Sequence, residues 1–426
     1  MIIKRSLIFS IGFVLFFAYA MPLRWIDLDN QAFEKISTAT YGGELIGKQI
    51  GAPLLALFLL VVLPFIPRAL QIIPKGFFAA AALPYMSLIW SIDPLRTFSA
   101  LIILTLTVLM SAMAVRIYGV QETVRRFWAL SVLVMLVSVA LAVIGDPHVM
   151  MFSTHAGLWR GLMNHKNTFA PFVSVILLMT VFGGEILQRG RLARAVVSLL
   201  CLLCLYMASS SAATVATAAA LGVGMLANIR LKSVAVRTTL YALGILATVG
   251  MASVVIANLD DFAAIAGRDI TLTGRTSLWQ AALPFTYQAP FGYGFATAGG
   301  TDIVNAMKAL SGWDYANSTH NIYISRALDV GWIGVALMLL WVVPMIMVVD
   351  PSRMRAEKTM LAAVATLHLV GGLAEAIGLL YTNAAFTLML ILSSGLRMKD
   401  AAPLVKAEVQ DIPAGDTIRS VAAARV

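Results

Sequence analysis

The feature that most constrains this chain is a series of apolar runs, each close to the length that a helix needs to cross a lipid bilayer. A hydrocarbon core about 30 Å thick takes roughly 20 residues of α-helix. The run 195–228 is too long for one span, and we divide it at Ser209–Ser211. Segmentation predicts twelve spans, over residues 6–23, 49–66, 77–92, 98–115, 127–144, 168–187, 195–209, 211–228, 238–257, 321–348, 359–375 and 384–396.

Composition points to the same class of protein. Hydrophobic residues make up 60% of the chain and charged residues 12%, whereas soluble domains are about 45–50% apolar and about 25% charged. This excludes a soluble globular enzyme, a disordered chain and a disulfide scaffold. We predict an all-α polytopic membrane protein with one transmembrane domain over residues 1–396, in which Cys201 and Cys204 are buried packing residues.

The net charge of +10 follows the membrane topology. In the proposed segmentation 21 of the 31 Lys and Arg residues lie on one side, and short cytoplasmic loops are the ones that carry such residues. Both termini are therefore predicted to be cytoplasmic, and the charge does not indicate a nucleic-acid partner. The tail 397–426 mixes charge, proline and small residues and is predicted to be disordered.

The largest loop on the opposite, outer side covers residues 258–320, and loops of this length are commonly functional. Residues 273–277, Thr-Gly-Arg-Thr-Ser, offer a capping residue for a short helix that begins just before Leu278. Arg275 lies at this helix start, where the free N–H groups favour an anion. Residues 290–295 are predicted to form a turn-rich shaped loop. Ile303, Met307 and Leu310 share one face of a second helix over residues 302–310, which suits a helix lying on the membrane surface.

A motif begins where this loop re-enters the membrane. His320-Asn321 is followed after nine residues by Gly331-Trp-Ile-Gly334, and Gly274-Arg275 and Trp279 precede it. This pattern resembles the shared domain of the O-antigen ligase and Wzy-type polymerase superfamily. The resemblance covers most of residues 77–345.

Two further segments extend the resemblance. Residues 160–167, Arg-Gly-Leu-Met-Asn-His-Lys-Asn, resemble the signature of ExoQ-like exopolysaccharide polymerases, and residues 90–94, Trp-Ser-Ile-Asp-Pro, are similar to the superfamily as well. One departure concerns the outer end of the eighth span. Relatives usually carry a basic residue after a serine there, where this chain reads Ser211-Ala212-Ala213, so Arg160 or Lys166 is expected to replace it.

The resemblance implies polymerisation of polyprenyl-diphosphate-linked oligosaccharide repeats into an exopolysaccharide, capsule or O-antigen chain. The lipid-linked oligosaccharide is both donor and acceptor, the reaction takes place at the periplasmic face of a bacterial inner membrane, and it needs no metal or other cofactor. A flippase and a chain-length regulator are the partners that it implies.

The residue types suit that chemistry. Histidine, with an ordinary pKa near 6.5, can act as a general base at neutral pH, and His320 is the predicted base. Arginine offers a two-pronged fork for phosphate, and Arg275 and Arg160 are predicted to bind the diphosphate. The other predicted substrate-binding residues are Asn164, His165, Lys166, Asn167, Arg268, Trp279, Tyr293 and Asn321, with Trp313 as a further candidate for stacking on sugars.

Several alternatives stay open. A ligase that transfers glycan to lipid A core or to protein shares the motifs, twelve spans also suit a transporter, and a scaffold subunit is a third class. His165 can instead cap the helix that follows it. The acidic loop at Asp27-Leu-Asp29 is interpreted as solvated, and no metal site is predicted.

Charged residues inside the predicted spans allow two interpretations. Arg326 and Asp329 lie three apart and are expected to pair. His368 and Glu375 lie seven apart on one face of the eleventh span, where they either line a cavity or pack against other helices.

Overall fold

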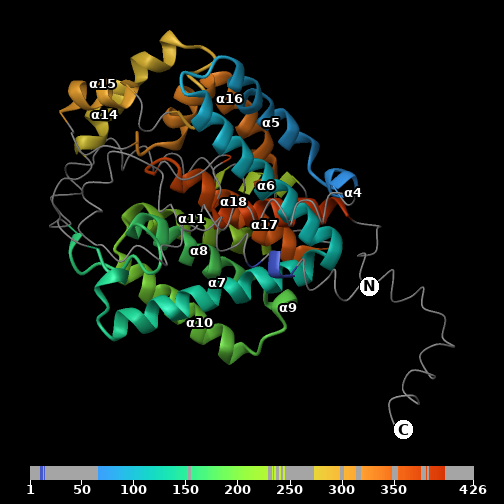
Figure 1. Cartoon of the computed structure of the whole chain (residues 1–426). Coiled ribbons are helices and arrows are strands. Elements are labelled where there is room, and N and C mark those ends of the chain that lie inside the picture. The colour runs from blue at the N-terminus through green and yellow to red at the C-terminus, as the bar shows by residue number, and fades with distance from the viewer. Residues whose placement is uncertain are drawn as a thin grey trace, which may run out of the picture.

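The structure is a computed structural model that describes residues 66–151, 155–228, 273–297, 302–312, 318–347, 354–375 and 383–398, with single positions within 10–14 and 233–244 and at 380. In these ranges the regular structure is helical, apart from an isolated β-bridge between Met150 and Trp159 (Figure 1). The fold is that of an all-α, multi-pass membrane protein, as the apolar runs predict.

Five helices of the described ranges are long and apolar enough to cross a membrane. They are α6 (Pro94–Tyr118), α7 (Val120–Val143), α10 (Arg191–Ala208), α11 (Ser211–Asn228) and α16 (Ile322–Met347). The shorter helices are α4 (Ile66–Leu70), α5 (Lys75–Met86), η2 (Ser87–Ile89), η3 (Pro147–Val149), α8 (Lys166–Phe182), α9 (Gly184–Leu187), α14 (Thr273–Gln288), α15 (Asp302–Ser311), α17 (Arg355–Gly371) and α18 (Ala384–Arg397).

These bounds test most of the predicted spans. The division at Ser209–Ser211 is confirmed, because Ser209 adopts a left-handed conformation that ends α10 and α11 begins at Ser211. The eleventh span was placed too far along the chain: α17 ends at Gly371, so Glu375 lies in the turn beyond the helix. The spans predicted over 6–23, 49–66 and 238–257, and the tail 397–426, lie almost entirely outside the described residues.

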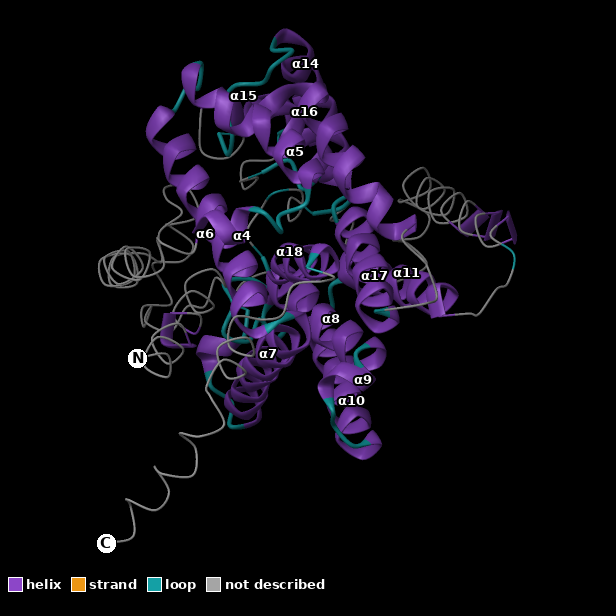
Figure 2. Cartoon of the chain, turned by 90° about the vertical axis from the view of Figure 1, so that its right-hand side faces the viewer, coloured by secondary structure: helices purple, strands orange, loops and turns teal. Residues whose placement is uncertain are grey.

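Helices α8, α17 and α18 form the centre of the bundle (Figure 2). Every residue of α17 from Glu357 to His368 and of α18 from Ala384 to Gly395 is buried. A helix that is apolar on all sides belongs in an interior of this kind. Helices α6 and α7 pack against α18, α10 packs against α8, and α11 packs against both α8 and α17.

Helix α10 lies at the edge of the bundle and has two unlike faces. Cys201 and Cys204 are buried, and the Cys201 thiol contacts the Met135 sulfur at 3.5 Å. The predicted packing role of both cysteines is therefore confirmed. On the other face Leu199, Leu202 and Tyr206 are exposed, as expected of a helix that borders lipid.

Helix α16 is broken at a point that another segment holds. Val330 and Gly331 leave helical geometry, with Gly331 at φ +72°. The break frees the carbonyl groups of Leu328 and Asp329, which accept hydrogen bonds from the N–H groups of Tyr293 (2.7 Å) and Gly294 (2.9 Å). We call residues 289–297 the clip, because they bind α16 at its kink.

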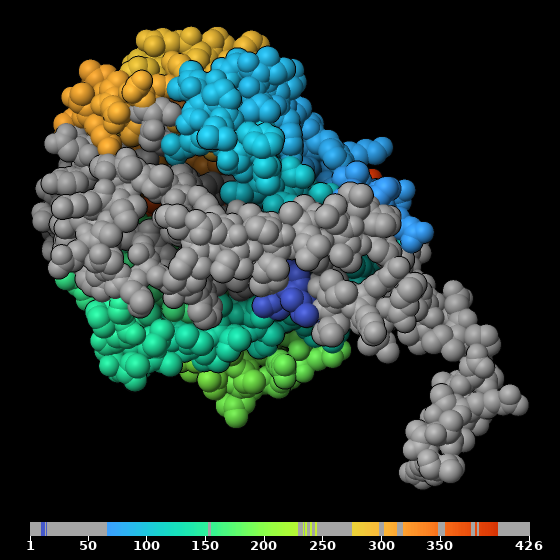
Figure 3. Space-filling model, viewed as in Figure 1, coloured from blue at the N-terminus to red at the C-terminus, as the bar shows by residue number. Residues whose placement is uncertain are grey.

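The clip also binds the segment that leads into α6. The Ile92 N–H donates to the Tyr293 carbonyl at 2.9 Å, and the Phe295 N–H donates to the Ser87 hydroxyl at 2.9 Å. Asp93 caps α6 by accepting from the Arg96 N–H. The turn-rich loop predicted at 290–295 is therefore confirmed, and it joins α5, α6 and α16 into one unit. Figure 3 shows that unit, with α14 and α15 beside α5, at one end of the molecule.

A substitution at Gly331 is expected to lower the stability of the folded protein strongly. A Cβ atom there would overlap the carbonyl oxygen of Pro290, and φ is positive. Strain and overlap together predict a loss of about 3 kcal/mol for Gly331→Ala, measured as a lower thermal midpoint of the protein in detergent. Gly222→Ala is the control, because that helical glycine has open space around its Cβ position. Equal midpoints for the two variants would contradict the clip as described.

Candidate active site

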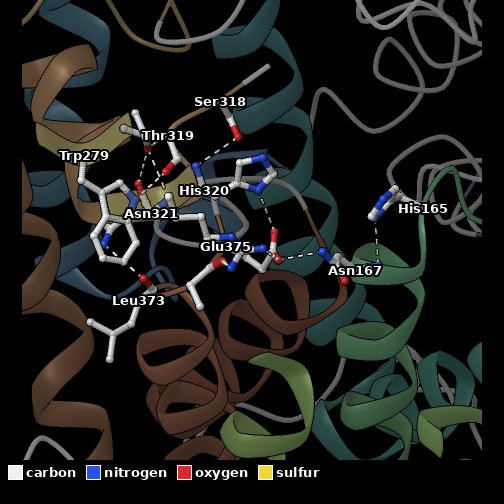
Figure 4. A network of polar contacts seen from close by, with 12 residues as sticks. His165, Asn167, Trp279, Ser318, Thr319, His320, Asn321, Leu373 and Glu375 are labelled. Atoms are coloured by element: carbon white, nitrogen blue, oxygen red, sulfur yellow. Dashed lines mark hydrogen bonds and ion pairs between the residues drawn. The ribbon is translucent and has the colours of Figure 1, made fainter. Parts of the chain in front are cut away.

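The buried carboxylate of Glu375 brings three distant segments together (Figure 4). Its Oε1 accepts from Asn167 Nδ2 at 2.7 Å and from Arg275 Nη2 at 2.9 Å, and its Oε2 lies 3.4 Å from His320 Nδ1. The Glu375 side chain is 9% exposed. We call these four residues the Glu375 cluster; they come from the start of α8, the start of α14, the segment before α16 and the turn after α17.

His320 stands on a backbone that is unusual for a side-chain-bearing residue. Its φ is +48°, a left-handed conformation in which histidine is more common than most residues. The Ser318 hydroxyl accepts from its N–H at 3.3 Å, and the Trp279 indole N–H donates to the neighbouring Thr319 carbonyl at 2.7 Å. The imidazole remains 27% exposed, so a ligand can reach it.

Asn321 connects α16 to the turn that carries Glu375. Its Oδ1 accepts from the N–H groups of Tyr323 (3.0 Å) and Ile324 (3.1 Å), and so caps α16. Its Nδ2 donates to the Leu373 carbonyl at 3.1 Å. Both ends of the Asn321 amide therefore have protein partners, and sugar binding by Asn321 stays a prediction.

A backbone contact strengthens the same connection. The Ile322 N–H donates to the Gly372 carbonyl at 2.8 Å, and a Cβ atom at Gly372 would overlap the Ile322 side chain. This close approach places the turn after α17 directly beside the residue that follows the His-Asn pair. The pair therefore has two functions: His320 presents an imidazole, and Asn321 fixes the position of the carboxylate that contacts it.

Arg275 lies in the first turn of α14, so the predicted short helix is confirmed. Its guanidinium donates to the Ala374 carbonyl and to Glu375. Leu278 and Ala282 of α14 pack with Met307 of α15 and Leu328 of α16. The large loop therefore folds onto the bundle. The helix predicted over 302–310 is confirmed, but its face is divided between Met307, which is buried in protein, and Leu310, which is exposed.

The segment before α8 lies against the end of α10. The Trp159 N–H donates to the Met207 carbonyl at 3.1 Å, and Lys166 Nζ donates to the Ser209 carbonyl at 3.2 Å. Lys166 is 9% exposed. A buried ammonium group therefore lies at the Ser209–Ser211 break, next to the place where relatives usually carry a basic residue. Arg160 Nε donates to the His148 carbonyl at 3.1 Å and helps to hold the η3 turn.

His165 is the N-cap of α8, as its second interpretation predicts. Its Nδ1 accepts from the Asn167 N–H at 3.1 Å. Burial, against the opposing charge of Glu375, lowers the pKa of His165 to about 4. This imidazole is therefore neutral at pH 7. Of the two histidines, His320 is the one with a hydrogen bond to the Glu375 carboxylate.

Glu375 itself is charged at neutral pH. Burial alone would raise the pKa of Glu375, but the hydrogen bond with His320 and the charge of Arg275 outweigh it and hold the pKa below its ordinary value. The site thus combines an accessible imidazole, an arginine fork and a fixed carboxylate. Such a set can transfer a proton and bind an anion at one place.

Other predicted site residues have different positions. Tyr293 belongs to the clip, and its hydroxyl donates to the Phe285 carbonyl. The Tyr293 N–H donates to the Leu328 carbonyl. Leu328 lies eight residues after His320, which corresponds to about 12 Å of helix. Trp279 supports the loop that carries His320, and Asn164 has a buried Oδ1 with no partner among the described residues. Arg268 and Trp313 lie outside the described residues.

Glu375 was not among the predicted site residues. The sequence feature that could have identified it is an acidic residue at the end of an apolar span. A charged residue within a membrane is energetically costly, and such residues are therefore commonly functional. Glu375 and His368 both line a cavity of about 50 Å³ between α8, α11, α17 and α18, so the cavity interpretation is confirmed. The predicted Arg326–Asp329 pair is also present.

Residues 196–339 match the family model described as O-antigen ligase, and this match contains Arg275, His320 and both motif glycines but ends before Glu375. No curated protein matches the chain. The match indicates a glycosyltransferase-like enzyme of the ligase and polymerase type that works on lipid-linked glycans. For residues 196–339, the match supports the resemblance to the O-antigen ligase and Wzy-type polymerase superfamily that the motifs predict.

Proposed function

We propose that this protein polymerises polyprenyl-diphosphate-linked oligosaccharide repeats at the periplasmic face of a bacterial inner membrane. The observation that carries the proposal is the meeting of His320 and Arg275 on one carboxylate, within the domain that matches the family. A base for the acceptor hydroxyl and a cation for the departing diphosphate are the two groups that glycosyl transfer requires without an added ion. The similarity of residues 160–167 to ExoQ-like polymerases favours chain growth.

The reaction is a substitution at the anomeric carbon of the donor. His320 takes the proton of an acceptor hydroxyl as that oxygen bonds to the anomeric carbon. The bond from this carbon to the diphosphate oxygen breaks, and the lipid diphosphate leaves with the electron pair. Arg275 stabilises the growing negative charge. Its guanidinium has five N–H donors, and two of its nitrogens are bonded to the 374–375 turn.

Lys166 is the proposed second cation. Its ammonium group contacts the Ser209 carbonyl at the break between α10 and α11, where relatives carry a basic residue. Arg160, the other candidate, donates from Nε to the His148 carbonyl in the η3 turn, so Lys166 is the candidate that contacts this break. Asn164 and Arg268 complete the proposed substrate-binding set, with a flippase and a chain-length regulator as functional partners.

A ligase is the second candidate function, because the family model carries that description. The decisive experiment uses the lipid-linked repeat that accumulates in a strain lacking this protein. We expect the purified protein in detergent to convert this repeat alone into a ladder of longer products, read by gel electrophoresis and mass spectrometry. A single unit transferred to added lipid A core, with no ladder, would establish the ligase. Neither product would reject both.

His320→Ala is expected to lower kcat about 100- to 10,000-fold, because the acceptor hydroxyl loses its base. The assay is the rate of ladder formation with the same lipid-linked repeat. His148→Ala is the matched control, since His148 pairs with Asp146 in the separate η3 turn, and it should retain the wild-type rate. An unimpaired rate for His320→Ala at a normal protein level would count against the proposed mechanism.

Lys166→Met is expected to raise KM for the lipid diphosphate about 10-fold, because one charge-assisted contact to the donor is lost. Lys166→Arg should restore most of the affinity. Lys75→Met, at the exposed start of α5, serves as a control that removes the same charge elsewhere. If Lys166→Met has the wild-type KM, the basic residue of relatives is not replaced by Lys166.

A further inference from the structure

The two oxygens of the Glu375 carboxylate have different partners. Oε1 accepts from both Asn167 Nδ2 and Arg275 Nη2, while Oε2 faces His320 Nδ1. The two bonds on Oε1 hold the carboxylate in place, so the direction of Oε2 does not depend on the histidine. The imidazole therefore meets an acceptor whose position is already set by other parts of the protein.

We propose that Glu375 is the positioning residue of the site: it orients His320 and keeps the proton on Nδ1, so that the lone pair that takes the proton of the acceptor is on Nε2. This role rests on the function proposed above. It assigns to Glu375, in the turn beyond α17, a part in the reaction that lies outside the matched region 196–339.

The hydrogen-bond geometry fixes the tautomer. An ionised carboxylate only accepts hydrogen bonds, so the nitrogen that faces it carries the proton. In a neutral imidazole the other nitrogen then holds a lone pair. Nε2 is that nitrogen, and the half-buried ring leaves it within reach of a substrate. With the proton on Nε2 instead, the lone pair of Nδ1 would face the carboxylate and the two groups would repel each other.

The charge of Glu375 acts in the same direction. When His320 takes up a proton the ring becomes positive, and a carboxylate beside Nδ1 stabilises that state. Arg275 from α14 opposes this effect. His165, from the segment before α8, is the other titratable group that faces Glu375 and His320, and it is neutral at pH 7.

The surroundings of Glu375 suit a fixed support. Asn321 donates to the Leu373 carbonyl, and the Ile322 N–H donates to the Gly372 carbonyl, so the turn is tied to the helix that follows His320. The carboxylate and the imidazole are thus held by one connected set of bonds. A small displacement of either would require several of these bonds to break.

The test compares Glu375→Gln with wild type in the full-length protein in detergent. Diethyl pyrocarbonate modifies unprotonated imidazole, and mass spectrometry of the peptide that contains His320 gives the pH midpoint of its reactivity. Loss of the carboxylate charge destabilises the protonated ring, so we expect the midpoint to fall by about 1 pH unit. The acidic limb of kcat/KM should move with it, and kcat should drop at least about 10-fold.

Two further variants separate positioning from general stability. Glu357→Gln removes another buried carboxylate, in α17 before the Glu375 turn, 2% exposed and bonded to Gln121, and should leave both pH midpoints unchanged. Glu375→Asp retains the charge on a side chain one methylene shorter, so its midpoint should stay near wild type while kcat falls. If Glu375→Gln does not fold, a wild-type kcat for Glu375→Asp would overturn the inference.

The outcomes also separate this inference from the proposed function. If His320→Ala is inactive and Glu375→Gln keeps the wild-type midpoint and rate, only the positioning role is rejected. If wild type forms no glycan product, the proposed function is rejected, while the reactivity midpoint of His320 still reports whether Glu375 controls its protonation. A lower midpoint in Glu375→Gln together with slower product formation supports both.

Discussion

A single buried negative charge accounts for most of the organisation around the candidate site. Glu375 is almost fully buried, and a buried carboxylate is costly unless it is paired and hydrogen-bonded. Its partners come from α8, from α14 of the large loop and from the segment before α16. Satisfying that charge therefore holds the large loop on the bundle. It also places a half-exposed imidazole and an arginine fork side by side, which is the arrangement that transfer from a diphosphate donor requires.

The sequence motif beginning at His320 divides into a chemical and a structural part. His320 presents the imidazole, whereas Asn321 caps α16 and ties it to the turn of Glu375. Gly331, at the far end of the motif, leaves space for Pro290 and lets the clip bind the freed carbonyl groups of α16. A glycine is needed there for the close approach of two backbones. Most of the motif thus shapes α16, the helix that directly follows His320.

Much of the fold could be predicted because the bilayer leaves few choices. Backbone groups in lipid must bond within helices, so apolar runs of the right length locate them, and the break at Ser209–Ser211 followed from length alone. The division of lysines and arginines predicted an outer side. In agreement with that topology, the starts of α8 and α16 and the ends of α10 and α17 meet at one end of the bundle. Contacts between distant segments were beyond such reasoning, which is why the structural contacts of Tyr293 and Asn321 were not predicted.

By itself, the sequence determined that this is a helical membrane protein, and it predicted a large loop and a site at His320 and Arg275, since spans and local motifs depend on residues close along the chain. Tertiary structure decided which partner each of them has. Glu375 lies 55 residues after His320 and 100 after Arg275, and no local pattern links positions so far apart. Whether the three residues meet depends on how α14, α16 and α17 pack. The buried charge of Glu375 requires hydrogen-bond donors, and only the folded protein brings those donors to it.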